Sequence, residues 1–74
     1  MNLETFMALY DNWNGITKVN DDNLNTIVKG RTTDIMDRRA PLHPSSSVKS
    51  YAKLLEMEVV AFGFYDNELC VRVV

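Results

Sequence analysis

Few side chains in this sequence could do chemistry, and soft ligands and nucleophiles are the scarcest. Cys70 is the only cysteine and His43 the only histidine. A structural zinc site needs about four nitrogen or sulfur ligands, so these two residues do not suffice for one. A nucleophilic pair would need a thiolate beside a base in an electropositive setting. Cys70 instead stands between Leu69 and Val71 in a strand-like segment, where a cysteine usually packs as a small hydrophobic residue.

Carboxylates are the next candidates, and the segment that begins at Asp11 superficially resembles a calcium-binding loop. Placing Gly15 at loop position six puts Tyr10 at position one and Asp21 at the place of the closing glutamate, so the pattern fails. Asp and Asn in such segments bond to the nearby backbone of turns. The three glycines are isolated, so they form no phosphate-binding loop either. We therefore expect no catalytic residue, no metal site, no cofactor and no enzymatic activity.

The best polar candidate is a group of residues in the middle of the chain, most of them basic. They could contact an acidic partner, and the predicted partner-binding residues are Arg38, Arg39, His43, Lys49 and Lys53. Together with Arg31, the same cations could instead hold a phosphate or a nucleic acid. A third interpretation is an ordinary solvated surface, in which Asp34 and Asp37 balance the two neighbouring arginines.

Composition limits the classes of protein that remain. The 74 residues form one domain, residues 1–74, with a net charge of −2 and a pI near 5.1. This charge argues against sequence-independent nucleic-acid binding, although a local basic patch remains possible. The longest apolar run, residues 59–64, is too short to cross a membrane, and no basic segment leads into an apolar one at the N-terminus. We therefore expect a cytoplasmic protein that does not bind membranes.

The strongest structural signal is a β-hairpin over residues 59–74. Asp66 and Asn67 tolerate the left-handed backbone of a type I′ turn, which places Tyr65 opposite Glu68. The register then predicts three apolar cross-strand pairs on one face: Phe64 with Leu69, Phe62 with Val71, and Val60 with Val73.

Weaker signals predict the remaining elements. Apolar residues at helical spacing predict a helix over residues 3–13, with Asn2 as its N-cap and Gly15 as a left-handed C-cap, and with Tyr10 and Trp13 in the core. Two strands, residues 16–20 and 24–29, flank an Asn- and Asp-rich turn, although residues 24–28 could instead form a helical turn. Thr32 or Thr33 could cap a single turn, residues 38–47 form a loop, and a second helix begins near Ser46 or Ser47 and ends near Met57.

Helices and hairpins that are separated along the chain indicate the α+β class. We expect a small domain with about four mostly antiparallel strands in two hairpins. Two helices should pack on the face that carries Phe62, Phe64, Leu69 and Val71. The other face should be mixed, with Ala61, Gly63, Tyr65, Glu68, Cys70 and Arg72.

Three segments give the chain a resemblance to known proteins: residues 10–15 (YDNWNG), residues 18–21 (KVND) and residues 61–71 (AFGFYDNELCV). In these segments the chain resembles short orphan proteins encoded by phages and mobile elements of low-GC Gram-positive bacteria. Several proteins of this kind bind and block host defence machinery, and the anti-CRISPR proteins are the best-known examples. The resemblance implies an inhibitor of a host defence effector such as a CRISPR nuclease, and it assigns no site residues.

These observations favour a non-enzymatic protein–protein interaction module whose partner is a host protein. The binding surface would be the loop over residues 38–47 with the start of the second helix, or an exposed edge of the sheet. A nucleic-acid or phosphate-binding protein is the alternative. Four short strands leave two open edges, so a homodimer is also expected.

Overall fold

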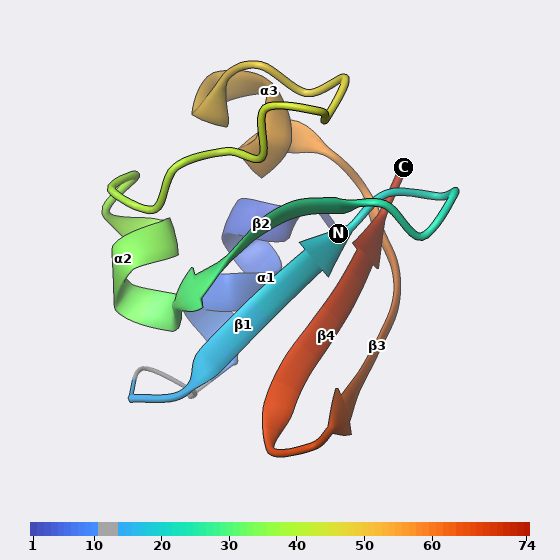
Figure 1. Ribbon diagram of the computed structural model, residues 1–74. Helices are drawn as coiled ribbons and strands as arrows, with labels where there is room; N and C mark the ends of the chain where they lie inside the picture. Colours follow the sequence, from blue (N-terminus) through green and yellow to red (C-terminus); the bar gives the residue numbers. More distant parts are fainter. Residues whose placement is uncertain (11–13) are drawn as a thin grey trace.

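The chain folds into a four-stranded sheet with helices on one side (Figure 1). The computed structural model describes residues 1–10 and 14–74. The strand order is β2-β1-β4-β3; each hairpin is antiparallel, and β1 and β4 pair in parallel at the centre. The predicted α+β class with two hairpins is confirmed. The elements in chain order are α1 (Leu3–Leu9), β1 (Ile16–Asn20), β2 (Thr26–Arg31), α2 (Thr32–Met36), α3 (Tyr51–Glu56), β3 (Val59–Tyr65) and β4 (Glu68–Val73).

The C-terminal hairpin has the predicted turn. Asp66 and Asn67 have φ angles of 53° and 65°, the left-handed conformation that a two-residue type I′ turn requires. The register is confirmed for three pairs, which are Tyr65 with Glu68, Phe64 with Leu69 and Phe62 with Val71.

The expected pairing of Val60 with Val73 is wrong. Val73 pairs with Val59, because the register shifts between Val59 and Ala61 in a β-bulge. The extra residue turns Val60 away from the covered face. The side chain of Val60 is therefore about half exposed at the start of β3.

Helix α1 begins as predicted and ends earlier. The Asn2 side chain accepts a hydrogen bond from the Thr5 amide at 2.9 Å, as an N-cap does. The helix ends at Leu9, and its C-cap is Tyr10 in an extended conformation. The predicted left-handed cap at Gly15 is wrong, because none of the described glycines has a positive φ. Trp13 lies outside the described residues.

The first hairpin has a longer turn than expected. One carboxylate oxygen of Asp21 accepts hydrogen bonds from the amides of Asn23 and Asn25, both at 2.9 Å. Leu24 takes a left-handed φ of 65° within this turn. Strand β2 therefore begins at Thr26 and continues past the predicted end at residue 29.

The two remaining helices are not capped as predicted. The N-cap of α2 is Arg31, without a side-chain hydrogen bond, and the hydroxyl of Thr32 instead lies 2.7 Å from that of Thr17. Helix α3 starts after Ser50, which accepts a hydrogen bond from the Lys53 amide. Ser46 is buried, and its hydroxyl accepts a hydrogen bond from the amide two residues later, so it closes a local turn.

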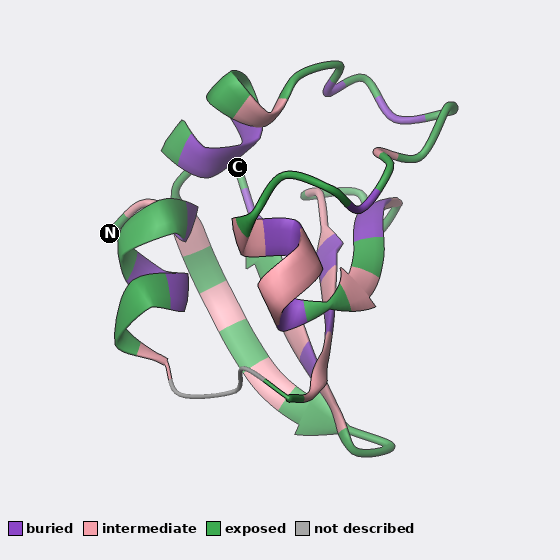
Figure 2. Cartoon of the chain, turned by 90° about the vertical axis from the view of Figure 1, so that its left-hand side faces the viewer, coloured by how far each residue is buried: buried purple, intermediate pink, exposed green. Residues whose placement is uncertain are grey.

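The core lies between the helices and the inner face of the sheet, as the buried segments in Figure 2 show. Leu69, Val71 and Val19 are each no more than 1% exposed. The expectation that helices cover Phe62 and Phe64 as well is wrong, because these rings are 58% and 52% exposed. The helices cover the central strands of the inner face and leave the β3 side of that face open.

Candidate functional site: the β3 edge

The five predicted partner-binding residues lie on the surface after β2. Arg38 is exposed and has a left-handed φ of 61°, directly after α2. Arg39 forms ion pairs with Asp34 at 3.3 Å and Asp37 at 3.1 Å. This pairing matches the solvated-surface interpretation for Arg39, because its charge is balanced by two carboxylates within its own segment.

Of the other three predicted residues, His43 and Lys49 also have partners nearby in the sequence. The imidazole Nδ1 of His43 lies 2.8 Å from the Ser45 hydroxyl, and the ammonium group of Lys49 donates to the Pro44 carbonyl at 2.9 Å. Lys53 is exposed on α3. Their role in partner binding stays a prediction.

Cys70 and His43 come from different parts of the fold. Cys70 lies in the middle of β4, and its sulfur is 3.9 Å from the Glu68 carbonyl oxygen. His43 lies beside β2, two strands away in the sheet. The two residues make no hydrogen bond with each other, and Cys70 is half-buried in the strand position expected for a small packing residue.

The two outer edges of the sheet differ in how they are covered. At β2, the His43 amide donates a 2.7 Å hydrogen bond to the Ile27 carbonyl, so the following loop occupies part of that edge. At β3, the N-terminal segment pairs only with the first residues, through an isolated bridge between Asn2 and Glu58 and a bond from the Val59 amide to the Met1 carbonyl. No other described residue pairs with this side of the strand.

We call residues 60–65 of β3 the β3 edge. In an antiparallel pair, alternate residues direct their backbone groups away from the partner strand, so this edge presents hydrogen-bonding groups to solvent. The segment Val59–Tyr65 contains no charged residue and no proline, which are the usual devices that prevent edge-to-edge pairing.

Large apolar side chains are exposed along the β3 edge. Phe62 and Phe64 lie on the inner side of the strand, and Val60, at 49% exposure, lies near its start. Large apolar side chains exposed along a sheet edge are a feature that soluble proteins generally cover with a partner.

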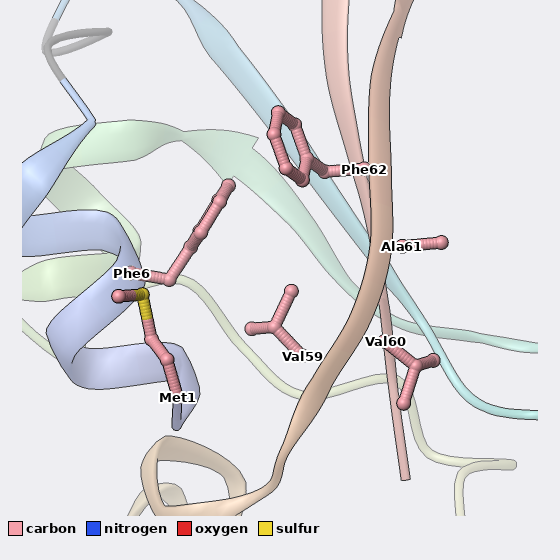
Figure 3. A pocket seen from close by; sticks show the side chains of 6 residues that line it. All are labelled: Met1, Phe6, Val59, Val60, Ala61 and Phe62. Carbon is pink, nitrogen blue, oxygen red and sulfur yellow. The ribbon is translucent and has the colours of Figure 1, made fainter.

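A pocket of about 430 Å³ opens beside this edge (Figure 3). Phe6, Phe62 and Val59 lie on one side of β3, whereas Val60 and Ala61 lie on the other. Carbon-rich side chains dominate the lining, so the pocket suits an apolar side chain. The lining residues are Met1, Phe6, Val59, Val60, Ala61 and Phe62.

Aromatic packing holds the exposed rings in place. The ring centroids of Phe6 and Phe62 are 4.9 Å apart, and Tyr10 lies 6.1 Å from Phe62 and 5.8 Å from Phe64. Phe6 is a buried residue of α1, so the cluster anchors two exposed rings to the core. The edge strand is thus ordered before any partner arrives, which reduces the entropy lost on binding.

Sequence reasoning placed an exposed edge among the candidate surfaces and did not identify which edge. The sequence lacked information about tertiary structure, namely which part of the sheet the helices cover. Phe62 and Phe64 share a face with buried residues by alternation, and only the positions of the three helices leave them exposed. The uninterrupted uncharged run over residues 59–65 was the available signal.

No family model, curated protein or solved structure was found to be similar to this chain. Within residues 1–10 and 14–74, none of the helices combines the length and the apolar character that a membrane crossing requires.

Proposed function

We propose that this protein is a non-enzymatic interaction module that binds its partner by strand addition at the β3 edge. The observation that supports this proposal is an edge strand without a charge or a proline, whose phenylalanines at positions 62 and 64 are 58% and 52% exposed. An added strand would satisfy the open backbone groups, and its alternate side chains would cover the two rings.

The pocket beside the edge gives the interaction a side-chain preference. Its apolar lining between α1 and the start of β3 accommodates one aliphatic or aromatic residue of the added strand. The partner is therefore a protein with an exposed, extended segment that carries apolar residues at every second position.

The resemblance to small phage and mobile-element proteins suggests what such binding achieves. A stoichiometric inhibitor acts by covering a functional surface, and it needs no catalytic residues of its own. A host defence effector, such as a CRISPR nuclease, is the class of partner to test first. A second copy of the chain is the other protein that could pair with this edge, which would give a homodimer.

The experiment uses a single charge placed on the edge. Val60→Lys introduces the type of residue that natural edge strands use against pairing, at a side chain that is already half exposed. Purified candidate effectors are titrated with the wild-type protein and the variant, and the complex is measured by calorimetry. Light scattering over a range of concentrations measures self-association of the same two proteins.

Leu24→Lys is the matched control. Leu24 is also a large exposed apolar residue, and it lies in the turn between β1 and β2, on the opposite side of the sheet from β3. We expect Val60→Lys to abolish both complex formation and self-association, whereas Leu24→Lys leaves them intact. If the wild-type protein forms a complex and the two variants bind the partner with equal affinity, the β3 edge is ruled out as the binding surface.

A further inference from the structure

The face of the sheet opposite the helices has a different character from the β3 edge. We call it the outer face. Side chains alternate between the two faces along a strand, so a residue belongs to the outer face when the residues on either side of it point into the core. No residue that it contains is buried, and Figure 1 shows α1 on the other side of the sheet. Its residues are Ile16, Lys18, Asn20, Thr26, Lys29, Arg31, Ala61, Gly63, Tyr65, Glu68, Cys70 and Arg72.

Positive charge is concentrated on this face. Half of the chain's eight Lys and Arg residues lie there, against a single carboxylate, that of Glu68. The chain as a whole has a net charge of −2, so its excess of acid lies elsewhere. Asp66, in the turn that follows Tyr65, is the acidic neighbour at one end of the face, and Asp21 and Asp22 follow β1 at the other. The basic residues are Lys18, Lys29, Arg31 and Arg72.

Two of these cations are direct cross-strand neighbours. Lys18 on β1 pairs with Lys29 on β2, and like charges in such positions destabilise a sheet. The Lys29 ammonium reaches across β1 to Glu68 on β4, at 3.0 Å, which offsets part of this repulsion. Lys18 has no carboxylate partner among the described residues. A like-charge pair on an uncovered face opposes folding, and a bound anion would relieve the repulsion.

The aromatic ring of Tyr65 lies against the same face. A Cβ atom added at Gly63 would come within 3.1 Å of the Tyr65 ring, so this ring lies over the glycine backbone. Tyr65 is nevertheless 66% exposed. Part of the ring is covered by β3, and the exposed remainder is available for stacking on the face that carries the basic residues, although the direct cross-strand neighbour of Tyr65 is Glu68.

We propose that the outer face binds a short segment of single-stranded nucleic acid. Lys18, Lys29, Arg31 and Arg72 would contact phosphates, and a base would stack on Tyr65. This combination of a positively charged surface with an exposed aromatic ring is how proteins bind single strands without reading their sequence.

Charge and ring together select this ligand over others. An acidic protein would complement the cations and would leave the exposed Tyr65 ring without a specific partner. Duplex DNA offers phosphates and keeps its bases stacked inside, where Tyr65 cannot reach them. The three rows of the face extend over roughly 13 Å along the strands, which fits a segment of a few nucleotides.

The test is fluorescence anisotropy with a labelled oligothymidylate, and with a duplex of the same length, at several salt concentrations. Lys18→Gln/Arg72→Gln removes two cations without disturbing the ion pair of Lys29. If both contact phosphates, the slope of log affinity against log salt becomes shallower by about 1.4. The affinity then falls by roughly 25-fold at about 0.1 M salt.

Lys49→Gln/Lys53→Gln makes the same change in charge on the surface near α3, and it tests the basic group that the sequence suggested. A loss as large as that of the outer-face variant would overturn the assignment. So would the absence of binding to the single strand at the lowest salt, or tighter binding to the duplex. Tyr65→Leu should weaken binding while Tyr65→Phe retains it, because the ring and not the hydroxyl stacks. Denaturation curves for every variant establish that each remains folded.

Discussion

Phe62 provides the sharpest test of the β3 edge, because its contribution to folding and its contribution to binding can be separated. The side chain is 58% exposed in the isolated chain. A phenylalanine buries roughly 200 Å² when fully covered, so this one has removed about 80 Å² from water. At about 25 cal/mol per Å², that area stabilises the fold by about 2 kcal/mol.

Phe6 is the matched comparison within the same aromatic cluster. Its ring centroid lies 4.9 Å from that of Phe62, and it is only 7% exposed. Phe6→Ala should lower the free energy of unfolding by about 3–5 kcal/mol, the range for buried phenylalanines. Phe62→Ala should lower it by about 2 kcal/mol, with up to about 1 kcal/mol more from the lost ring pair. Urea denaturation, followed by circular dichroism, measures both values.

The binding measurement gives the complementary result. A partner strand that covers the remaining area of Phe62, about 120 Å², gains at most about 3 kcal/mol from it. Phe62→Ala should therefore weaken the complex by up to about 100-fold. If Phe62→Ala is as destabilising as Phe6→Ala and leaves association unchanged, then Phe62 is a core residue and the reasoning about the edge is wrong.

Two further predictions concern the framework that holds the sheet. Burial, together with the negative charge of Asp34, raises the pKa of Tyr51 above its ordinary value of 10.0, and its hydroxyl donates a hydrogen bond to the Ala40 carbonyl. The folded state therefore retains a proton that the unfolded chain loses, so the contribution of Tyr51 to stability should be fully present below about pH 10 and be lost as the pH rises above it. Tyr51→Phe should cost about 1 kcal/mol at neutral pH and flatten that alkaline fall in denaturation curves. Asp21→Ala should cost about 1–3 kcal/mol of unfolding free energy in the same assay, because it removes the acceptor of two turn amides, whereas Asp22→Ala, in the same turn, should change stability by less than about 0.5 kcal/mol.

The sequence was sufficient to predict those parts of the fold in which local chemistry decides. The type I′ turn at Asp66 and Asn67 sets the register of the C-terminal hairpin, and Asn2 caps α1 as its side chain suggests. Both depend on contacts within a few residues. The parallel pairing of β1 with β4 could not be obtained in the same way, because it joins segments about 50 residues apart whose alternation fits several strand orders.

The errors of prediction arise where several local solutions compete. Three serines precede Val48, and each could cap a helix; burial of Ser46 commits its hydroxyl to a local turn, so the cap passes to Ser50. The bulge at Val60 is similar, since alternation alone continues smoothly through it. In both cases the packing of a neighbouring element selects among options that the local sequence leaves nearly equal in energy.

The β3 edge and the outer face meet at one strand without excluding each other. Strand addition extends a sheet sideways, in its own plane, whereas a ligand on the outer face approaches perpendicular to that plane. The inner side of β3 carries Phe62 and Phe64, and its outer side carries Gly63 and Tyr65. A partner strand would therefore cover the phenylalanines and leave Tyr65 exposed on the face that carries the basic residues. It follows that Phe62→Ala should weaken protein binding and leave nucleic-acid binding intact, whereas Lys18→Gln/Arg72→Gln should do the reverse. One variant that removed both activities while remaining folded would show that a single surface serves both.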